Sequence, residues 1–225
     1  MKAPSIDLYR ETLREVVSEL PQRPYSWDAK AKDGVSADVV WDGVRLYRKG
    51  EPSFYYCVGA VAQATITTLK RMGLEKEIPA EILKKWRKHL FLYAENPVNT
   101  RDPLMKGGPG GMVALGLGDF VNMEDVQYGD VCQIWHVHAE TGHAIRGHAV
   151  IATGKGSRSK GAILENWSAS PTMSGIGADW HYLNYSLGED EKKFDPSRHS
   201  KEYNRVIYAA RWNFEKIVAL KGGER

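Results

Sequence analysis

The sequence predicts an α+β protein in which helices precede an antiparallel sheet. Up to about residue 95, apolar residues recur at the three- and four-residue spacing of helices, and beyond residue 120 β-branched and alternating runs replace that spacing. The two kinds of segment do not alternate along the chain as they do in βαβ folds. The 225 residues, 42% of them hydrophobic, suffice for one substantial core, so a single domain over 1–225 is expected.

The N-terminal region is predicted to contain one helix and then a long loop. Residues 5–20 carry an apolar stripe, with Ser5 as the N-cap and Pro21 after the last turn. Residues 22–52 are polar with scattered aromatic residues, and within them only 43–47 has the character of a short strand.

The next segment, "SFYYCVGAVAQA" and its continuation, predicts a helix that begins at Cys57. Apolar positions recur at helical spacing as far as Met72, and Gly73 is a typical C-terminal stop. Cys57 therefore lies at a helix N-terminus, where unpaired N–H groups and the macrodipole favour a thiolate. Gly59 is expected to leave room for the backbone of a substrate.

Residues 76–127 are predicted to form a helical and glycine-rich insertion. A second helix over 79–95 starts at Pro79, and its lysines and arginines are interpreted as a solvated face. The glycine-rich segment 106–111 lacks the Lys-Ser/Thr of a phosphate loop and is predicted to be a flexible loop before a short helix at 111–117. Two roles remain open for this loop: a lid beside the cleft, or a passive surface connection.

The C-terminal half is predicted to supply the sheet. Four runs bounded by turn residues have strand character, at 130–138, 148–154, 161–167 and 204–212. The chain thus divides into an N-terminal helix and loop (1–52), the helix with Cys57 (53–75), the insertion (76–127), the sheet region (128–214) and a tail (215–225).

A catalytic cysteine needs a base, and the base needs a group that orients it. Among four clustered histidines, His148 opens an apolar strand after Gly147, where a polar side chain is expected to face the helix across the sheet. The following strand carries Asn166, which can orient the His148 ring, and Trp167, which can shield that bond from water. The order Cys, His, Asn is that of papain-like enzymes.

Three motifs resemble those of the NlpC-type cysteine peptidases, bacterial cell-wall hydrolases of the papain-like superfamily. "YYCVGAV" (55–61), "YGDVCQIW" (128–135) and "GHAVIATG" (147–154) occur in the order of that family, and the similarity covers about residues 53–170. Val58 and Tyr56 depart from the Ser and Asp of the family motif, and the interval between the first two motifs is long.

The resemblance implies a nucleophile helix packed on an antiparallel sheet in a papain-like core. It also implies cleavage of an amide bond in a peptidoglycan stem peptide, with no cofactor. A protein acting on the bacterial cell wall is expected outside the cytoplasm, in the periplasm or secreted, although the N-terminal residues lack the apolar core of a signal peptide.

The third catalytic residue is open, because this family often uses a histidine there. Strand alternation puts Glu165 and Asn166 on opposite faces, so only one of them can reach His148. Asn166 is preferred, Ser168 on the same face is the second choice, and Glu165 and His181 are the remaining candidates.

Further residues are candidates for substrate or oxyanion binding. Tyr55 and Tyr56 precede the nucleophile and are predicted either to donate to an oxyanion or to line a wall of the groove. Gly147, Trp167 and Ser168 complete the expected binding set.

No metal site and no disulfide are expected. His136, His138, His143 and His148 are close in sequence, but this short stretch lacks a poised acidic base and is interpreted as groove or surface histidine. Cys132, the only other cysteine, is expected to be an unpaired, inert thiol.

Composition and charge limit the kinds of partner that the protein is expected to bind. The net charge of +3 is scattered and no basic run predicts a nucleic-acid partner. No apolar stretch approaches the ~20 residues of a membrane span. The oligomeric state stays open.

The preferred function is an amide hydrolase. The alternatives are thiol acyl transfer or deamidation on the same fold, and a non-catalytic binding module.

Overall fold

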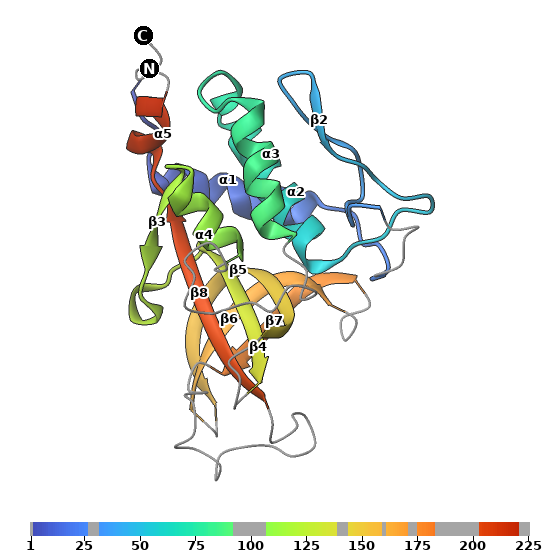
Figure 1. Cartoon of the computed structure of the whole chain (residues 1–225), viewed down its shortest axis with the longest axis vertical. Coiled ribbons are helices and arrows are strands. Elements are labelled where there is room, and N and C mark those ends of the chain that lie inside the picture. Colours follow the sequence, from blue (N-terminus) through green and yellow to red (C-terminus); the bar gives the residue numbers. More distant parts are fainter. Residues whose placement is uncertain are drawn as a thin grey trace.

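The computed structural model describes residues 2–26, 32–91, 107–138, 144–158, 161–170, 175–182 and 203–220. Five α-helices pack on a six-stranded antiparallel sheet with a separate hairpin, so the predicted α+β class with an antiparallel sheet is confirmed. Figure 1 shows the helices gathered at one end of the molecule and the long strands extending away from them. Within these residues no helix is long and apolar enough to cross a membrane.

The helices follow the local signals of the sequence closely at their N-termini. The Ser5 side chain accepts a hydrogen bond from the Leu8 N–H at 3.1 Å, as an N-cap should. Gly73, just past the second long helix, has φ 75°, the left-handed conformation expected of a helix stop. The helices are α1 (Ile6–Glu19), α2 (Cys57–Arg71), α3 (Ala80–Leu90), α4 (Gly107–Ala114) and α5 (Phe214–Leu220), with 3₁₀ turns η2 (Leu74–Lys76) and η4 (Met123–Asp125).

The main sheet has the strand order β3-β8-β4-β5-β6-β7. All of its neighbouring strands are antiparallel. It consists of β3 (Gly118–Val121), β4 (Val131–His138), β5 (Ala144–Arg158), β6 (Gly161–Ser170), β7 (Gly175–Tyr182) and β8 (Tyr203–Trp212). The separate hairpin consists of β1 (Val39–Trp41) and β2 (Val44–Tyr47), so the short strand expected at 43–47 is confirmed.

Two apolar clusters lie on the two faces of this sheet. The larger one joins the helices to the residues of β5 and β6 that face α2, among them Ala149, Ile151 and Trp167. The smaller one contains Ile134 and Val150, with Cys132, Ala152, Leu164 and Ala209. Successive side chains of a strand point to opposite faces, which is why neighbours in sequence fall into different clusters.

The prediction of a flexible glycine loop is wrong for residues 107–111. These residues are buried and form the start of α4, while residue 106 lies outside the described residues. A Cβ added to Gly108 would lie 2.6 Å from the Leu90 side chain, and one added to Gly111 would lie 2.6 Å from the His89 Cβ. The glycines allow α4 to approach α3 closely, so neither a lid nor a passive surface loop describes this segment.

Several other boundaries differ from the prediction. The helix predicted at 79–95 begins at Ala80 after Pro79 as N-cap and ends at Leu90, and residues 92–95 lie outside the described residues. Strands β3 and β7 and helix α5, which occupies part of the predicted tail, were not predicted.

Candidate active site

Cys57 is the first residue of α2, as predicted, with Tyr56 as its N-cap. The cysteine is only 1% exposed. Both cysteines are free and buried, and Cys132 lies in the smaller cluster on the other face of the sheet. The candidate nucleophile therefore occupies the expected place on its helix but is covered.

The Cys57 sulfur lies against the backbone of β5. The backbone N–H of Ala149 is directed at the sulfur, together with the N–H groups of Val58 and of Cys57 itself. The carbonyl of Ala149 accepts a hydrogen bond from the Ser168 hydroxyl at 2.7 Å. The pairing of β5 with β6 begins at Ile151 and Trp167 and does not include Ala149. The N–H of Ala149 points instead to the Cys57 thiol, and its carbonyl accepts from the Ser168 hydroxyl. This arrangement places the sulfur at the peptide bond between His148 and Ala149.

Burial raises the pKa of the Cys57 thiol to about 11, although the three backbone N–H groups act in the opposite direction. The prediction that Cys57 is a thiolate is therefore wrong for this conformation, in which the protonated thiol is favoured. Removal of the sulfur from water disfavours its charged form more than the helix N-terminus favours it.

Alkylation of Cys57 is expected to be slow at neutral pH. Because the thiolate is the reactive form and its pKa is about 11, the labelling rate should rise about tenfold per pH unit up to that value. The measurement is iodoacetamide labelling of the folded protein between pH 7 and 11, followed by mass analysis of the peptide that carries Cys57. A labelling midpoint below the ~8.5 of an ordinary cysteine would contradict the burial of this thiol.

An N-terminal segment covers the start of α2. The Tyr55 N–H donates to the Pro24 carbonyl at 2.9 Å, and the Ser26 N–H donates to the Tyr55 carbonyl at 3.0 Å, which fixes Tyr25 between them. Burial raises the pKa of the Tyr25 hydroxyl, and Cys57 raises it further, so the two groups are close. The sequence contained no signal for this cover, because residues 22–52 have only loop character.

The space expected beside Gly59 for a substrate is filled by the chain itself. A Cβ on Gly59 would overlap the carbonyl oxygens of Asp33 and Gly34, and one on Gly34, whose φ is 64°, would overlap the Tyr56 ring. The Tyr56 N–H also donates to the Gly34 carbonyl at 3.4 Å. Gly59 is thus required by the close approach of the turn at 32–34 to α2.

Gly59→Ala should lower the free energy of unfolding by about 2 kcal/mol, because overpacking costs about 1–3 kcal/mol and outweighs the gain in helix propensity. Urea unfolding measures this change. Thr67→Ala, at a half-buried position of α2, is the control and should change stability little. An unchanged or raised stability in Gly59→Ala would show that the turn at 32–34 does not lie against the helix.

The His148 side chain does not face α2, which corrects the expectation. Ala149, the next residue along β5, belongs to the larger cluster, which packs on α2. Ile134, which pairs with His148 across β4 and β5, belongs to the smaller cluster, and so does Val150, two residues further along β5. Alternation therefore directs the His148 ring to the face opposite to α2. The Cys57 sulfur approaches the same point of β5 from the helix side, where the Ala149 N–H is directed at it.

His181 lies beside His148 on this face. The two rings are 5.5 Å apart between centroids and meet edge-on at 78°. His181 pairs with Leu164 across β6 and β7, and Leu164 belongs to the smaller cluster, so both histidines share one face. The sequence named His181 only as a remaining candidate, because nothing in its local pattern showed which strand partner it had.

Asn166 does not orient His148 in this structure. It is fully buried, and its amide Nδ2 donates to the Leu164 carbonyl at 3.3 Å. Its Oδ1 has no hydrogen-bond partner within the described ranges. Of the other candidates, Ser168 joins β6 to Ala149 and Glu165 is exposed.

The remaining predicted residues have structural partners. The Tyr56 hydroxyl donates to the Lys32 carbonyl at 3.0 Å, and Tyr55 is fully buried, so the structure directs neither toward an oxyanion. A Cβ on Gly147 would lie 2.5 Å from the Trp135 ring, which accounts for this glycine by packing. Trp167 belongs to the larger cluster instead of covering a His–Asn bond.

The aspartate of the second motif also has a structural role. Asp130 is 1% exposed and accepts two hydrogen bonds from Arg211, from Nε and from a terminal nitrogen, at 2.9 Å each. Its Oδ2 also accepts from the Gln127 N–H at 2.8 Å. This carboxylate therefore fixes the turn before β4 to β8.

The histidine cluster lies mainly outside what the structure describes. His143 lies outside the described residues, and for His136 and His138 the backbone in β4 is described but the side chains are not. In the described part of the chain, no group of three or more His, Cys, Asp or Glu side chains is arranged to hold a metal ion.

The arrangement has a thiol at a helix N-terminus on one face of the sheet and, on the other face, a histidine pair from β5 and β7. Proton transfer from the sulfur to His148 requires the ring to leave this face of the sheet, because Ala149 and the sulfur lie on the side of α2. No protein-family model, no curated protein and no solved structure matches this chain significantly. The similarity to NlpC-type peptidases thus depends on the three motifs alone.

Proposed function

We propose that this protein is a cysteine hydrolase that cleaves an amide bond in a peptidoglycan stem peptide, as the motif resemblance implies. The observation that carries the proposal is the position of the Cys57 sulfur, at a helix N-terminus and against the His148–Ala149 peptide bond. The site of action would be the cell wall, outside the cytoplasm.

Catalysis on this site begins with exposure of the thiol. Displacement of Tyr25 exposes the sulfur to a substrate, and a rearrangement of β5 brings the His148 ring to the side of α2, where it accepts the thiol proton. The thiolate then attacks the carbonyl carbon of the amide, and His148 returns the proton to the leaving amine. Water, activated by the neutral ring, hydrolyses the thioester and releases the acid.

His181 is proposed as the residue that positions the His148 ring, in place of Asn166. His181→Ala should lower kcat by about ten- to a thousand-fold, because an orienting partner fixes the ring but does not react. Asn166→Ala, the comparison on the same face, should lower the stability and leave kcat nearly unchanged. Steady-state kinetics and urea unfolding of both variants measure this, and the reverse pattern would restore Asn166 as the orienting residue.

The function is tested by incubating the protein with purified sacculi and identifying the soluble products by mass. Peptide fragments with one new amine and one new carboxyl terminus are expected, at a rate that strong chelators do not change. Glycan fragments, or activity that chelators abolish and zinc restores, would contradict the proposal. An added amine nucleophile reports acyl transfer, because a transferase makes the new amide in preference to the acid.

The burial of Cys57 favours a second candidate function, that of a binding module with the same fold and no catalytic activity. Such a protein would bind sacculi in a sedimentation experiment and release no fragments. The wild type and Cys57→Ala would then bind equally and both be inactive.

A further inference from the structure

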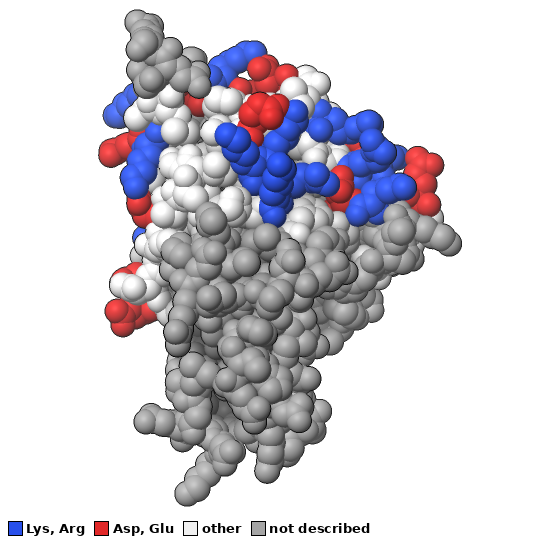
Figure 2. All heavy atoms as spheres, viewed as in Figure 1, with Lys and Arg blue, Asp and Glu red and all other residues white. Residues whose placement is uncertain are grey.

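Basic side chains gather on one surface of the molecule, over α3 and the β1–β2 hairpin (Figure 2). Two adjoining depressions lie there, with volumes of about 470 and 360 Å³, and both are lined by Lys32, Arg45 and Arg48. Volumes of this size are typical of sites for small molecules. The remaining lining residues are Asp33, Asp38, Leu46, Tyr47, Lys49, Glu51 and Arg87.

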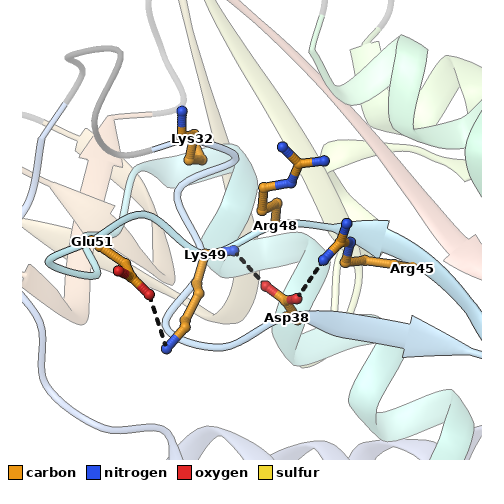
Figure 3. A pocket seen from close by; sticks show the side chains of 6 residues that line it. All are labelled: Lys32, Asp38, Arg45, Arg48, Lys49 and Glu51. Carbon is orange, nitrogen blue, oxygen red and sulfur yellow. Dashed lines mark hydrogen bonds and ion pairs between the residues drawn. The ribbon is translucent and has the colours of Figure 1, made fainter.

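Most charges in these depressions neutralise one another. Arg45 pairs with Asp38 at 3.2 Å. Lys49 pairs with Glu51 at 3.9 Å. Both of these pairs are drawn in Figure 3, where the Lys49 ammonium group points away toward Glu51. Each carboxylate there thus already has a cationic partner.

In the second depression, Arg87 pairs with Asp33 at 2.5 Å. Arg87 also lies over the Tyr47 ring, 5.3 Å from its centroid, and this contact holds the guanidinium against the hairpin. The third carboxylate of the lining is therefore neutralised as well.

Two cations are left without a carboxylate. Among the described residues, the Lys32 ammonium and the Arg48 guanidinium make no ion pair and no side-chain hydrogen bond. Figure 3 shows both side chains extending to the same side of the hairpin. Their charges are therefore available to a ligand.

The backbone holds these two residues together. The Arg48 N–H donates to the Asp33 carboxylate at 2.6 Å, and the Asp33 N–H donates to the Arg48 carbonyl at 3.1 Å. The Lys32 carbonyl accepts from the Tyr56 hydroxyl, which ties the same turn to α2. A pair of cations fixed in this way needs little rearrangement to bind an anion.

We propose that Lys32 and Arg48 form a binding site for a small ligand bearing a phosphate or carboxylate group. A guanidinium binds such groups through two parallel hydrogen bonds, and an ammonium supplies a second charge beside it. The paired Arg45 and Lys49 leave the local charge too low for an extended polyanion, so a compact ligand is favoured over a nucleic acid. The site uses no catalytic residue and does not depend on the proposed hydrolase activity.

The test is an NMR titration of the full chain that follows the backbone amides of Gly34 and Arg48. Inorganic phosphate and acetate are titrated separately at constant ionic strength, with chloride as the reference anion. Saturable shifts with either anion are expected, and the stronger of the two identifies the ligand group. Arg48→Gln and Lys32→Gln should each weaken binding about five-fold, the effect of one exposed ion pair with good geometry.

Lys85→Gln is the matched control, because Lys85 is an exposed residue of α3 outside both depressions. It should leave the affinity unchanged. Non-saturable shifts with both anions, or equal weakening in all three variants, would overturn the proposal, since either result would indicate general attraction to a basic surface. Single-stranded DNA that binds more tightly than phosphate and loses affinity equally in all three variants would likewise overturn it in favour of a nucleic-acid surface.

Discussion

Replacing Cys57 by alanine should abolish amide hydrolysis, with a loss of at least about 10⁴-fold in kcat/KM. The reason is that no other described group lies at the start of α2 to form the thioester, so removal of the sulfur leaves only substrate binding. The free energy of unfolding should fall by only about 1 kcal/mol, since one small buried atom is lost. Product release from sacculi and urea unfolding measure the two quantities.

Cys132→Ala is the matched control for this variant. Cys132 is equally buried, but it lies in the smaller cluster on the other face of the sheet. A similar loss of stability with unchanged turnover is expected there. Equal turnover in Cys57→Ala and the wild type would show that the sulfur takes no part in the reaction, whatever the state of Cys132.

Helix positions were predictable because their signals are local. Ser5 caps α1 through a bond to a residue three positions away, and Gly73 ends α2 through its own backbone conformation. The start of α2 at Cys57 has no side-chain cap and was predictable from the helical spacing of the apolar residues that follow it. Caps and stops depend on neighbours in sequence, so they can be recognised without knowledge of the fold.

The glycine-rich segment was misinterpreted because the local signal of glycine is ambiguous. A run of glycines is typical of a flexible loop, but it also allows two helices to approach closely. Only the positions of Leu90 and His89 on α3 decide between the two, since these side chains occupy the space of the missing Cβ atoms of Gly108 and Gly111.

The arrangement of the candidate site depended on non-local facts. The face on which His148 lies follows from its pairing with Ile134, and one residue of shift would reverse it. The pairing of β6 with β7 places His181 on that same face, although β7 itself was not predicted. Likewise, Tyr25 lies near Cys57 because residues 24–26 pair with Tyr55.

His148→Ala should lower kcat by about 10³-fold, because the base that accepts the thiol proton is lost. The need for a base is large in this site, since burial raises the thiol pKa to about 11 and spontaneous ionisation at neutral pH is rare. Steady-state kinetics between pH 5 and 10 are the measurement.

The pH profile separates a base from a merely structural histidine. With His148 present, the rate should level off well below the thiol pKa of about 11, because the ring and not hydroxide then accepts the thiol proton. Without it, the rate should keep rising about tenfold per pH unit toward the thiol pKa of about 11, because hydroxide then removes the proton. Val150→Ala is the control: it removes packing from the same face of β5 and should lower stability while keeping the wild-type profile. If His148→Ala instead behaves like Val150→Ala, His148 belongs to the smaller cluster only, and the base for Cys57 is another group.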